Sequence, residues 1–78
     1  MSMEDRVREI IASVFKLKKE QLTDNMDFIK DLNAQSYDIA ELIALLEEEF
    51  QVEIDPLRAR QNKTIGQVID YIKELTKR

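Results

Sequence analysis

The sequence predicts an all-α domain: a small four-helix bundle of three longer helices and one short helix, with a long loop between the first two. Apolar residues recur at helical spacing in three segments. The chain contains one glycine and one proline, so few residues interrupt a helix. Its 78 residues, 44% apolar and 36% charged, suit a single folded domain spanning residues 1–78.

The first helix is expected at about residues 3–17. Ser2 is followed three residues later by Asp5, a pattern typical of a helix start. Lysines crowd the other end, where the helix dipole favours positive charge. The residues that mark the predicted buried face are Met3, Val7, Ile10, Ile11, Val14 and Phe15.

Residues 18–35 form a long connection, and a connection of that length in a small domain is often functional. Its apolar residues should hold it against the core. They are Leu22, Met26, Phe28, Ile29 and Leu32.

The second helix is expected from Ser36 or Tyr37 to about Phe50. Ser36 stands just before the first periodic apolar residue, where an N-cap belongs. The unpaired N–H groups and the positive dipole end there would favour a phosphate on the Ser36 hydroxyl. The apolar face comprises Ile39, Leu42, Ile43, Leu46 and Phe50.

Asp55 and Pro56 are typical of a cap and a first helical residue, so a short third helix should follow them. Leu57 and Ala59 are its expected buried residues. Its cationic residues, Arg58, Arg60 and Lys63, make this segment locally basic. Two residues just before it, Val52 and Ile54, are expected to face inward.

The last helix should begin after Thr64 and run to about Thr76. Thr64 and Gln67 have the spacing of a capping box. Gly66 lies in the first turn, where a glycine costs less than it would mid-helix. The predicted buried face comprises Ile65, Val68, Ile69, Ile72 and Leu75.

The residue types that are absent from the sequence exclude several kinds of function. Without cysteine there is no disulfide, thiolate nucleophile or thiolate metal site, and without histidine no Ser–His–Asp triad. We therefore predict that the protein is not an enzyme. The net charge of −4 argues against nucleic acid and anionic membranes as partners. With no membrane-length apolar run and no signal-peptide pattern, we expect a cytoplasmic monomer that does not insert into membranes.

The segment Leu32-Asn33-Ala34-Gln35-Ser36-Tyr37-Asp38, followed by an acidic helix, resembles the attachment motif of the acyl carrier protein family, Leu-Gly-Ala-Asp-Ser-Leu-Asp. The resemblance extends from about Glu4 to Leu75. It implies that a phosphopantetheinyl transferase attaches phosphopantetheine to Ser36. It also implies that acyl groups travel as thioesters on that arm, in fatty-acid, polyketide or related biosynthesis.

The motif departs from the family pattern at three positions. Asn33 replaces a glycine, and asparagine tolerates the left-handed region better than most residues. Gln35 replaces an aspartate and so removes a negative charge beside the attachment site. Tyr37 replaces a leucine. The change at Gln35 bears on which transferase would modify the protein.

The far side of the second helix has the composition of a contact surface. Tyr37, Glu41, Ala44 and Glu48 share one stripe, and an aromatic and apolar residues among acids are typical of an interface. The resemblance implies that acyl-transferring and acyl-modifying enzymes dock here through basic patches. The predicted partner-binding residues are Gln35, Tyr37, Asp38, Glu41, Ala44, Leu45, Glu47 and Glu48.

Two alternatives remain open from the sequence. A peptidyl or aminoacyl carrier would share the fold and the serine. The other alternative is a protein-interaction module of the same fold that is no longer modified on the serine. Gln35 is the main support for this alternative.

Overall fold

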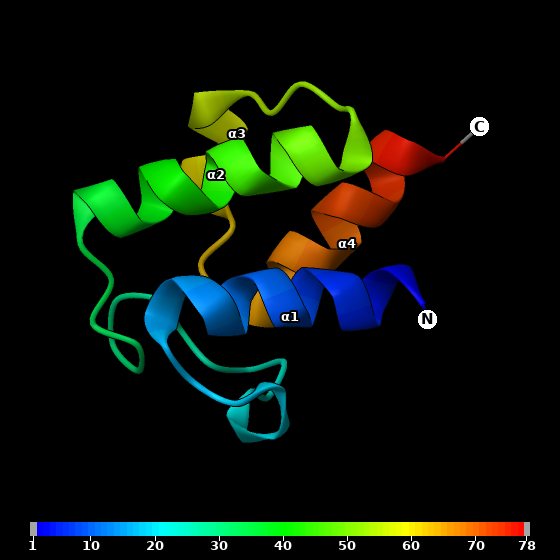
Figure 1. Ribbon diagram of the computed structural model, residues 1–78. Helices are drawn as coiled ribbons and strands as arrows, with labels where there is room; N and C mark the ends of the chain where they lie inside the picture. Colours follow the sequence, from blue (N-terminus) through cyan, green and yellow to red (C-terminus); the bar gives the residue numbers. More distant parts are fainter. Residues whose placement is uncertain (1, 78) are drawn as a thin grey trace.

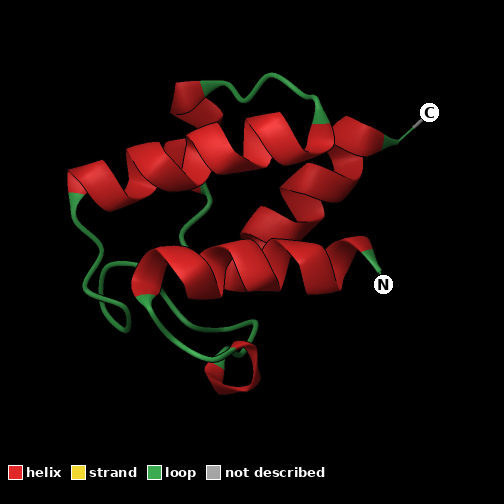
Figure 2. Cartoon of the chain, viewed as in Figure 1, coloured by secondary structure: helices red, strands yellow, loops and turns green. Residues whose placement is uncertain are grey.

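The computed structural model describes residues 2–77, and the predicted all-α fold is confirmed over them (Figures 1 and 2). The helices are α1 (Met3–Phe15), α2 (Ser36–Phe50), α3 (Pro56–Gln61) and α4 (Ile65–Thr76), with a 3-10 turn, η1 (Lys19–Gln21), in the long connection. No helix within residues 2–77 combines the length and the apolar character needed to cross a bilayer.

The helices α1 and α2 run in opposite directions, and α4 crosses them obliquely, as Figure 1 shows. The short α3 lies beside α2, and the long connection runs below α1 in this view before it bends around to the start of α2. The apolar faces predicted for the three longer helices meet in one core. Its most deeply buried side chains are Val7, Ile11, Ile65 and Ile72.

Helix α1 begins as predicted and ends two residues earlier than expected. The Ser2 hydroxyl accepts a hydrogen bond from the Asp5 N–H, with 3.1 Å between the heavy atoms. At the other end Lys16 adopts a left-handed conformation, with φ of 58°. The Leu17 N–H then donates back to the Ala12 carbonyl at 2.9 Å, which closes the helix at Phe15.

The prediction that the connection packs on the core is confirmed for four residues and wrong for Ile29, which is 64% exposed. The Asp27 carboxylate accepts hydrogen bonds from the N–H groups of Ile29 and Lys30, at 2.8 and 2.9 Å, and so turns the chain at Ile29. Phe28 takes the inward position instead and packs 6.0 Å from Phe15 between ring centroids. The four that do contact the core are Leu22, Met26, Phe28 and Leu32.

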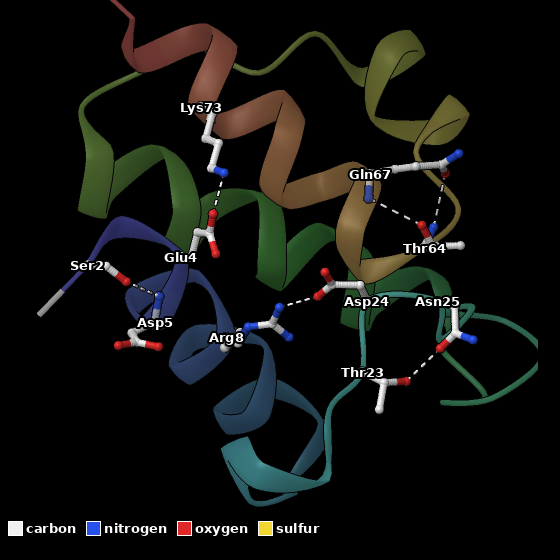
Figure 3. Close-up of polar contacts among 10 residues, drawn as sticks. All are labelled: Ser2, Glu4, Asp5, Arg8, Thr23, Asp24, Asn25, Thr64, Gln67 and Lys73. Atoms are coloured by element: carbon white, nitrogen blue, oxygen red, sulfur yellow. Dashed lines mark hydrogen bonds and ion pairs between the residues drawn. The ribbon is translucent and has the colours of Figure 1, made fainter.

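The connection is tied to the start of α4 by main-chain hydrogen bonds. Gly66 donates its N–H to the Asp24 carbonyl at 2.8 Å, and Ile65 donates to the Met26 carbonyl at 3.1 Å. The Asp24 carboxylate also pairs with Arg8 of α1 (Figure 3). Because a β-carbon on residue 66 would lie only 3.1 Å from the Asp24 carbonyl oxygen, the glycine permits this close approach.

The capping box predicted for α4 is confirmed. The Thr64 hydroxyl accepts from the Gln67 N–H at 3.2 Å, and the Gln67 side chain accepts from the Thr64 N–H at 3.2 Å (Figure 3). Lys73 near the end of α4 pairs with Glu4 in the first turn of α1, so the two terminal helices are joined at the same end of the bundle.

Helix α3 begins as predicted, with the Asp55 carboxylate accepting from the Leu57 N–H at 2.9 Å. The prediction that Leu57 is buried is wrong, because its side chain is 70% exposed. A helix of six residues turns only one narrow side to the core, and Ala59 occupies it. Tyr71 of α4 is also buried, which the helical pattern did not indicate, and its hydroxyl accepts from the Asp55 N–H at 3.2 Å.

Candidate functional site

The serine of the motif is the first residue of α2 and not its N-cap, which corrects the prediction. The cap residue is Gln35, in an extended conformation with φ of −96° and ψ of 166°. Asp38 completes the cap, because its carboxylate accepts from the Gln35 N–H at 2.9 Å. The sequence pattern placed the cap one residue too late and so did not indicate this role of Asp38.

The turn before the serine has the conformation that the sequence suggested. Asn33 lies in the left-handed region, with φ of 53°. Ala34, the next residue, is buried, and its N–H donates to the Phe28 carbonyl at 2.8 Å. The buried alanine and the left-handed asparagine therefore hold the connection in place and bring Ser36 to the surface.

Ser36 is exposed, and its hydroxyl has no hydrogen-bond partner among residues 2–77. It borders a groove of about 310 Å³, which we call the α2–α3 groove. This groove is mostly apolar, and Arg60 is the single charged residue among its described lining. The groove is lined by Ile29, Ala34, Gln35, Ser36, Ile39, Ala40, Ile43, Pro56 and Arg60.

Two further spaces adjoin this groove, and Ile39 lines all three. One is a surface hollow of about 360 Å³ between the connection and α3, where Phe28, Lys30, Arg60 and Lys63 are among the lining residues. The other is a small apolar cavity of about 40 Å³ between α2, α3 and α4. A cavity of that size holds a few water molecules at most, so a longer chain could enter only if the helices moved apart.

The acids of α2 differ in how far they are engaged inside the molecule. One oxygen of Glu47 accepts from the Ile54 N–H at 2.9 Å, which ties the α2–α3 linker to the helix. Arg6 of α1 lies 2.9 Å from Glu49, and this hydrogen bond lowers the pKa of the Glu49 carboxyl. By contrast, Glu41 and Glu48 are exposed, and neither carboxylate forms an ion pair or hydrogen bond with another residue that the structure describes.

The other residues predicted to contact partners lie on the surface. Tyr37 is 72% exposed and Leu45 is 37% exposed, and both are among the few large apolar side chains that the described surface shows to solvent. Ala44 and Gln35 are also exposed. The fold therefore brings the apolar residues and two unengaged acids of the predicted stripe together on the outer side of α2.

Sequence reasoning missed that Arg60 lines the groove next to Ser36. The basic composition of the third helix was visible, and it was the only available signal. Which of its cations faces the serine depends on how α3 packs beside α2, and no spacing in the sequence states that.

A serine presented at the start of an acidic helix, next to an open groove, defines a domain that can carry a group on its hydroxyl. The family model of the phosphopantetheine attachment site matches residues 5–72 of the chain. The exposed hydroxyl, which has no partner among the described residues, and the open groove beside it fit that prosthetic group.

The chain is similar along its length to acyl carrier proteins. It is 47% identical over 73 residues to the acyl carrier protein of Chlamydia caviae, covering 94% of this chain and 95% of the relative. It is 46% identical over 74 residues to that of Chlamydia muridarum, covering 95% and 96%.

Solved structures agree. The acyl carrier protein of Enterococcus faecalis superposes with a TM-score of 0.78 at 35% identity, covering 92% of this chain and 91% of that one. A Mycobacterium tuberculosis protein solved as a candidate acyl carrier protein superposes with a TM-score of 0.86 at 27% identity, covering 94% and 97%.

The chain belongs to the acyl carrier protein family. It is a carrier rather than a catalyst, and its prosthetic group is phosphopantetheine. Membership of this family also implies that the protein interacts with acyl chains and with biosynthetic enzymes that act on them.

Proposed function

We propose that the hydroxyl of Ser36 is the attachment point of phosphopantetheine, and that the protein carries acyl intermediates of fatty-acid or related biosynthesis on that arm. The observation that carries the proposal is the exposed hydroxyl at the first residue of α2, bordering an open groove. The bound group supplies the thiol on which an acyl chain is held as a thioester, because the protein itself contains no cysteine. The residues of the chain present that group to partner enzymes.

The first turn of α2 suits the phosphodiester that such a link requires. Unpaired backbone N–H groups and the positive dipole end favour an anion on the hydroxyl. The Asp38 carboxylate is drawn back to the Gln35 N–H, where it completes the cap. The helix terminus thus stays ordered while Ser36 remains accessible to a transferase.

We further propose that the outer side of α2 is the docking surface for the transferase and the acyl-modifying enzymes. Glu41 and Glu48 would attract a basic patch, and Tyr37, Ala44 and Leu45 would supply apolar contact. Asp38 and Glu47 have internal partners, so their contribution to docking is secondary to their structural one. Exposed ion pairs contribute only about 0.2–1 kcal/mol each, which suits brief and salt-sensitive encounters with several enzymes.

The acyl chain itself would lie against the α2–α3 groove and the apolar side of the adjoining hollow. Deeper entry requires α2 and α3 to part, because the small apolar cavity between them has room for only about 40 Å³. Burial of the acyl chain contributes about 0.8 kcal/mol per methylene, and the cost of opening the packed core offsets part of that gain.

We also propose that the protein carries its acyl groups in the cytoplasm, as the sequence predicts.

The attachment site is tested by intact-mass analysis after coexpression with a promiscuous phosphopantetheinyl transferase. We expect a mass gain of one phosphopantetheine in the parent protein and none in Ser36→Ala. An unmodified parent protein would favour the interaction-module alternative. A gain that persists in the Ser36→Ala variant would place the arm elsewhere.

The docking surface is tested with a standard acyl carrier synthase as the probe and the unmodified protein as its substrate. Glu41→Lys should raise KM about two- to fivefold, as expected for the loss of one exposed ion pair. Glu53→Lys is the control, because Glu53 is exposed, lies outside α2 and gives the same change in net charge. Equal effects of the two variants would contradict the assigned surface.

The role of Gln35 is tested in the same assay. Gln35→Asp restores the negative charge that the family motif has beside the serine, so we expect faster modification by the standard synthase. An unchanged rate would show that residue 35 does not determine which transferase acts on this protein.

A further inference from the structure

We propose that Arg60 of α3 binds the phosphodiester that joins the arm to Ser36, and so holds the root of the arm across the α2–α3 groove. The inference rests on the proposed attachment at Ser36. It assigns to this chain an anion-binding side chain that lies outside the attachment motif.

The proposal rests on the observation that Ser36 and Arg60 line the same groove. Ser36 comes from α2 and Arg60 from α3, and both border the same space of about 310 Å³. Every other described residue that lines it is uncharged, including Gln35 beside the serine. A phosphodiester formed on Ser36 would therefore meet one charged side chain in this groove, and that charge is opposite to its own.

Arg60 is available for this contact, whereas its neighbour Arg58 is engaged elsewhere. Arg58 lies 3.3 Å from Glu74 and stacks 4.9 Å above the ring of Tyr71, both on α4. Arg60 forms no ion pair with another residue in the described range 2–77. A guanidinium presents several donors in a planar fork that matches phosphate oxygens, so it suits this ligand better than an ammonium group.

The adjoining hollow has more cationic than acidic side chains in its described lining. The hollow that continues from the groove is lined by Lys30 and Lys63 as well as Arg60. Its one acid is Asp27, whose carboxylate accepts the N–H groups of Ile29 and Lys30. The hollow beyond the groove therefore has a net positive lining, while Asp38, the acid nearest Ser36 in sequence, is held by the Gln35 N–H.

The consequence concerns where the arm points. Attraction to Arg60 would lay the first part of the arm over α3 and away from the acidic outer side of α2. Arg60 is then a positioning residue: it orients the arm toward the apolar groove without taking part in acyl transfer.

The experiment compares how much attachment of the arm raises the thermal midpoint in three proteins: the parent, Arg60→Gln and Arg58→Gln. Intact mass first confirms complete loading of each. Loading should raise the midpoint by roughly 1–8 °C more in the parent than in Arg60→Gln, as expected for one exposed charge pair in a domain of this size. Arg58→Gln should lower the thermal midpoint of both the unloaded and the loaded protein. The rise in midpoint on loading should nevertheless be the same as in the parent. The phosphorus NMR resonance of the arm should shift in Arg60→Gln alone.

Three results would overturn the proposal. The first is an equal increment in the parent and Arg60→Gln. The second is a difference that does not shrink at all between about 0.1 M and about 1 M salt, because the attraction between exposed charges weakens as the Debye length falls from about 10 Å to about 3 Å. The third is an Arg60 effect that appears only when the cargo ends in a free carboxylate, which would make the cargo and not the phosphodiester the ligand.

The same comparison with phosphoserine incorporated at position 36 needs no transferase. It therefore tests Arg60 separately from the attachment. Suppose that phosphopantetheine is attached to none of the proteins, but phosphoserine raises the thermal midpoint more in the parent than in Arg60→Gln. The proposed function then fails while the anion site stands. If neither the loaded protein nor the phosphoserine protein shows a rise that depends on Arg60, the anion site is refuted.

Discussion

Glu47 provides the sharpest test of how the acids of α2 divide between structure and docking. Its carboxylate accepts the Ile54 N–H at 2.9 Å in a partly buried setting. Ile54 itself is buried in the core, so the hydrogen bond holds the linker between α2 and α3 in place. Glu48, the next residue, is exposed and its carboxylate has no partner in the described range, which makes it a matched control.

Glu47→Ala leaves the Ile54 N–H without its partner. A hydrogen bond to a charged group contributes about 1.5–3 kcal/mol, and partial exposure reduces this to about 1–2 kcal/mol. For a domain of this size the thermal midpoint should therefore fall by roughly 4–16 °C. Glu48→Ala makes the same change in side chain and charge, so we expect a free-energy change within about 0.5 kcal/mol of zero.

The assay is thermal unfolding followed by circular dichroism at matched protein concentration and salt. Glu47→Gln keeps an oxygen acceptor without the charge and should fall between the parent and Glu47→Ala. The reasoning is refuted if Glu47→Ala and Glu48→Ala have the same midpoint. It is also refuted if Glu47→Ala lowers affinity for the synthase while its stability is unchanged, because Glu47 would then be a docking residue first.

Three further predictions follow from the contacts. Gly66→Ala should lower the free energy of unfolding, because the added β-carbon would crowd the Asp24 carbonyl. This effect should outweigh the better helix propensity of alanine, which is about 1 kcal/mol. A variant that is more stable than the parent in urea unfolding would refute the prediction. Tyr71→Phe should cost about 1 kcal/mol, since its hydroxyl accepts a main-chain N–H at the start of α3; an unchanged urea midpoint would contradict it. The N–H of Lys30 lowers the pKa of Asp27, so this carboxylate stabilises the fold above its unfolded pKa and that stability is lost as the pH falls. Asp27→Asn should thus flatten the drop in thermal midpoint between about pH 5 and pH 2, and an equally steep drop would disprove the assignment.

The exposed acids also bear on how such variants are interpreted. Because Glu49 pairs with Arg6 and Asp38 caps its own helix, replacing all acids of α2 together would change stability and docking at once. Variants at Glu41 and Glu48 separate the two effects, since the carboxylates of these residues have no internal partner in the described chain.

The sequence by itself determined the order and approximate limits of the helices, their inward faces and the serine of the motif. These features depend on local physics: helical periodicity, capping side chains, the left-handed tolerance of Asn33 and the starting pair Asp55 and Pro56. The capping box at Thr64 follows from the same kind of short-range rule.

Tertiary structure alone decided which residues near the helix ends turn inward and which acids are engaged. Ile29 and Leu57 are apolar but exposed, because a turn at Asp27 and the brevity of α3 leave no core for them to contact. Whether Arg60 borders the groove at Ser36 depends on the packing of segments more than twenty residues apart. Periodicity and capping act over about four residues, so no local pattern could specify that neighbour.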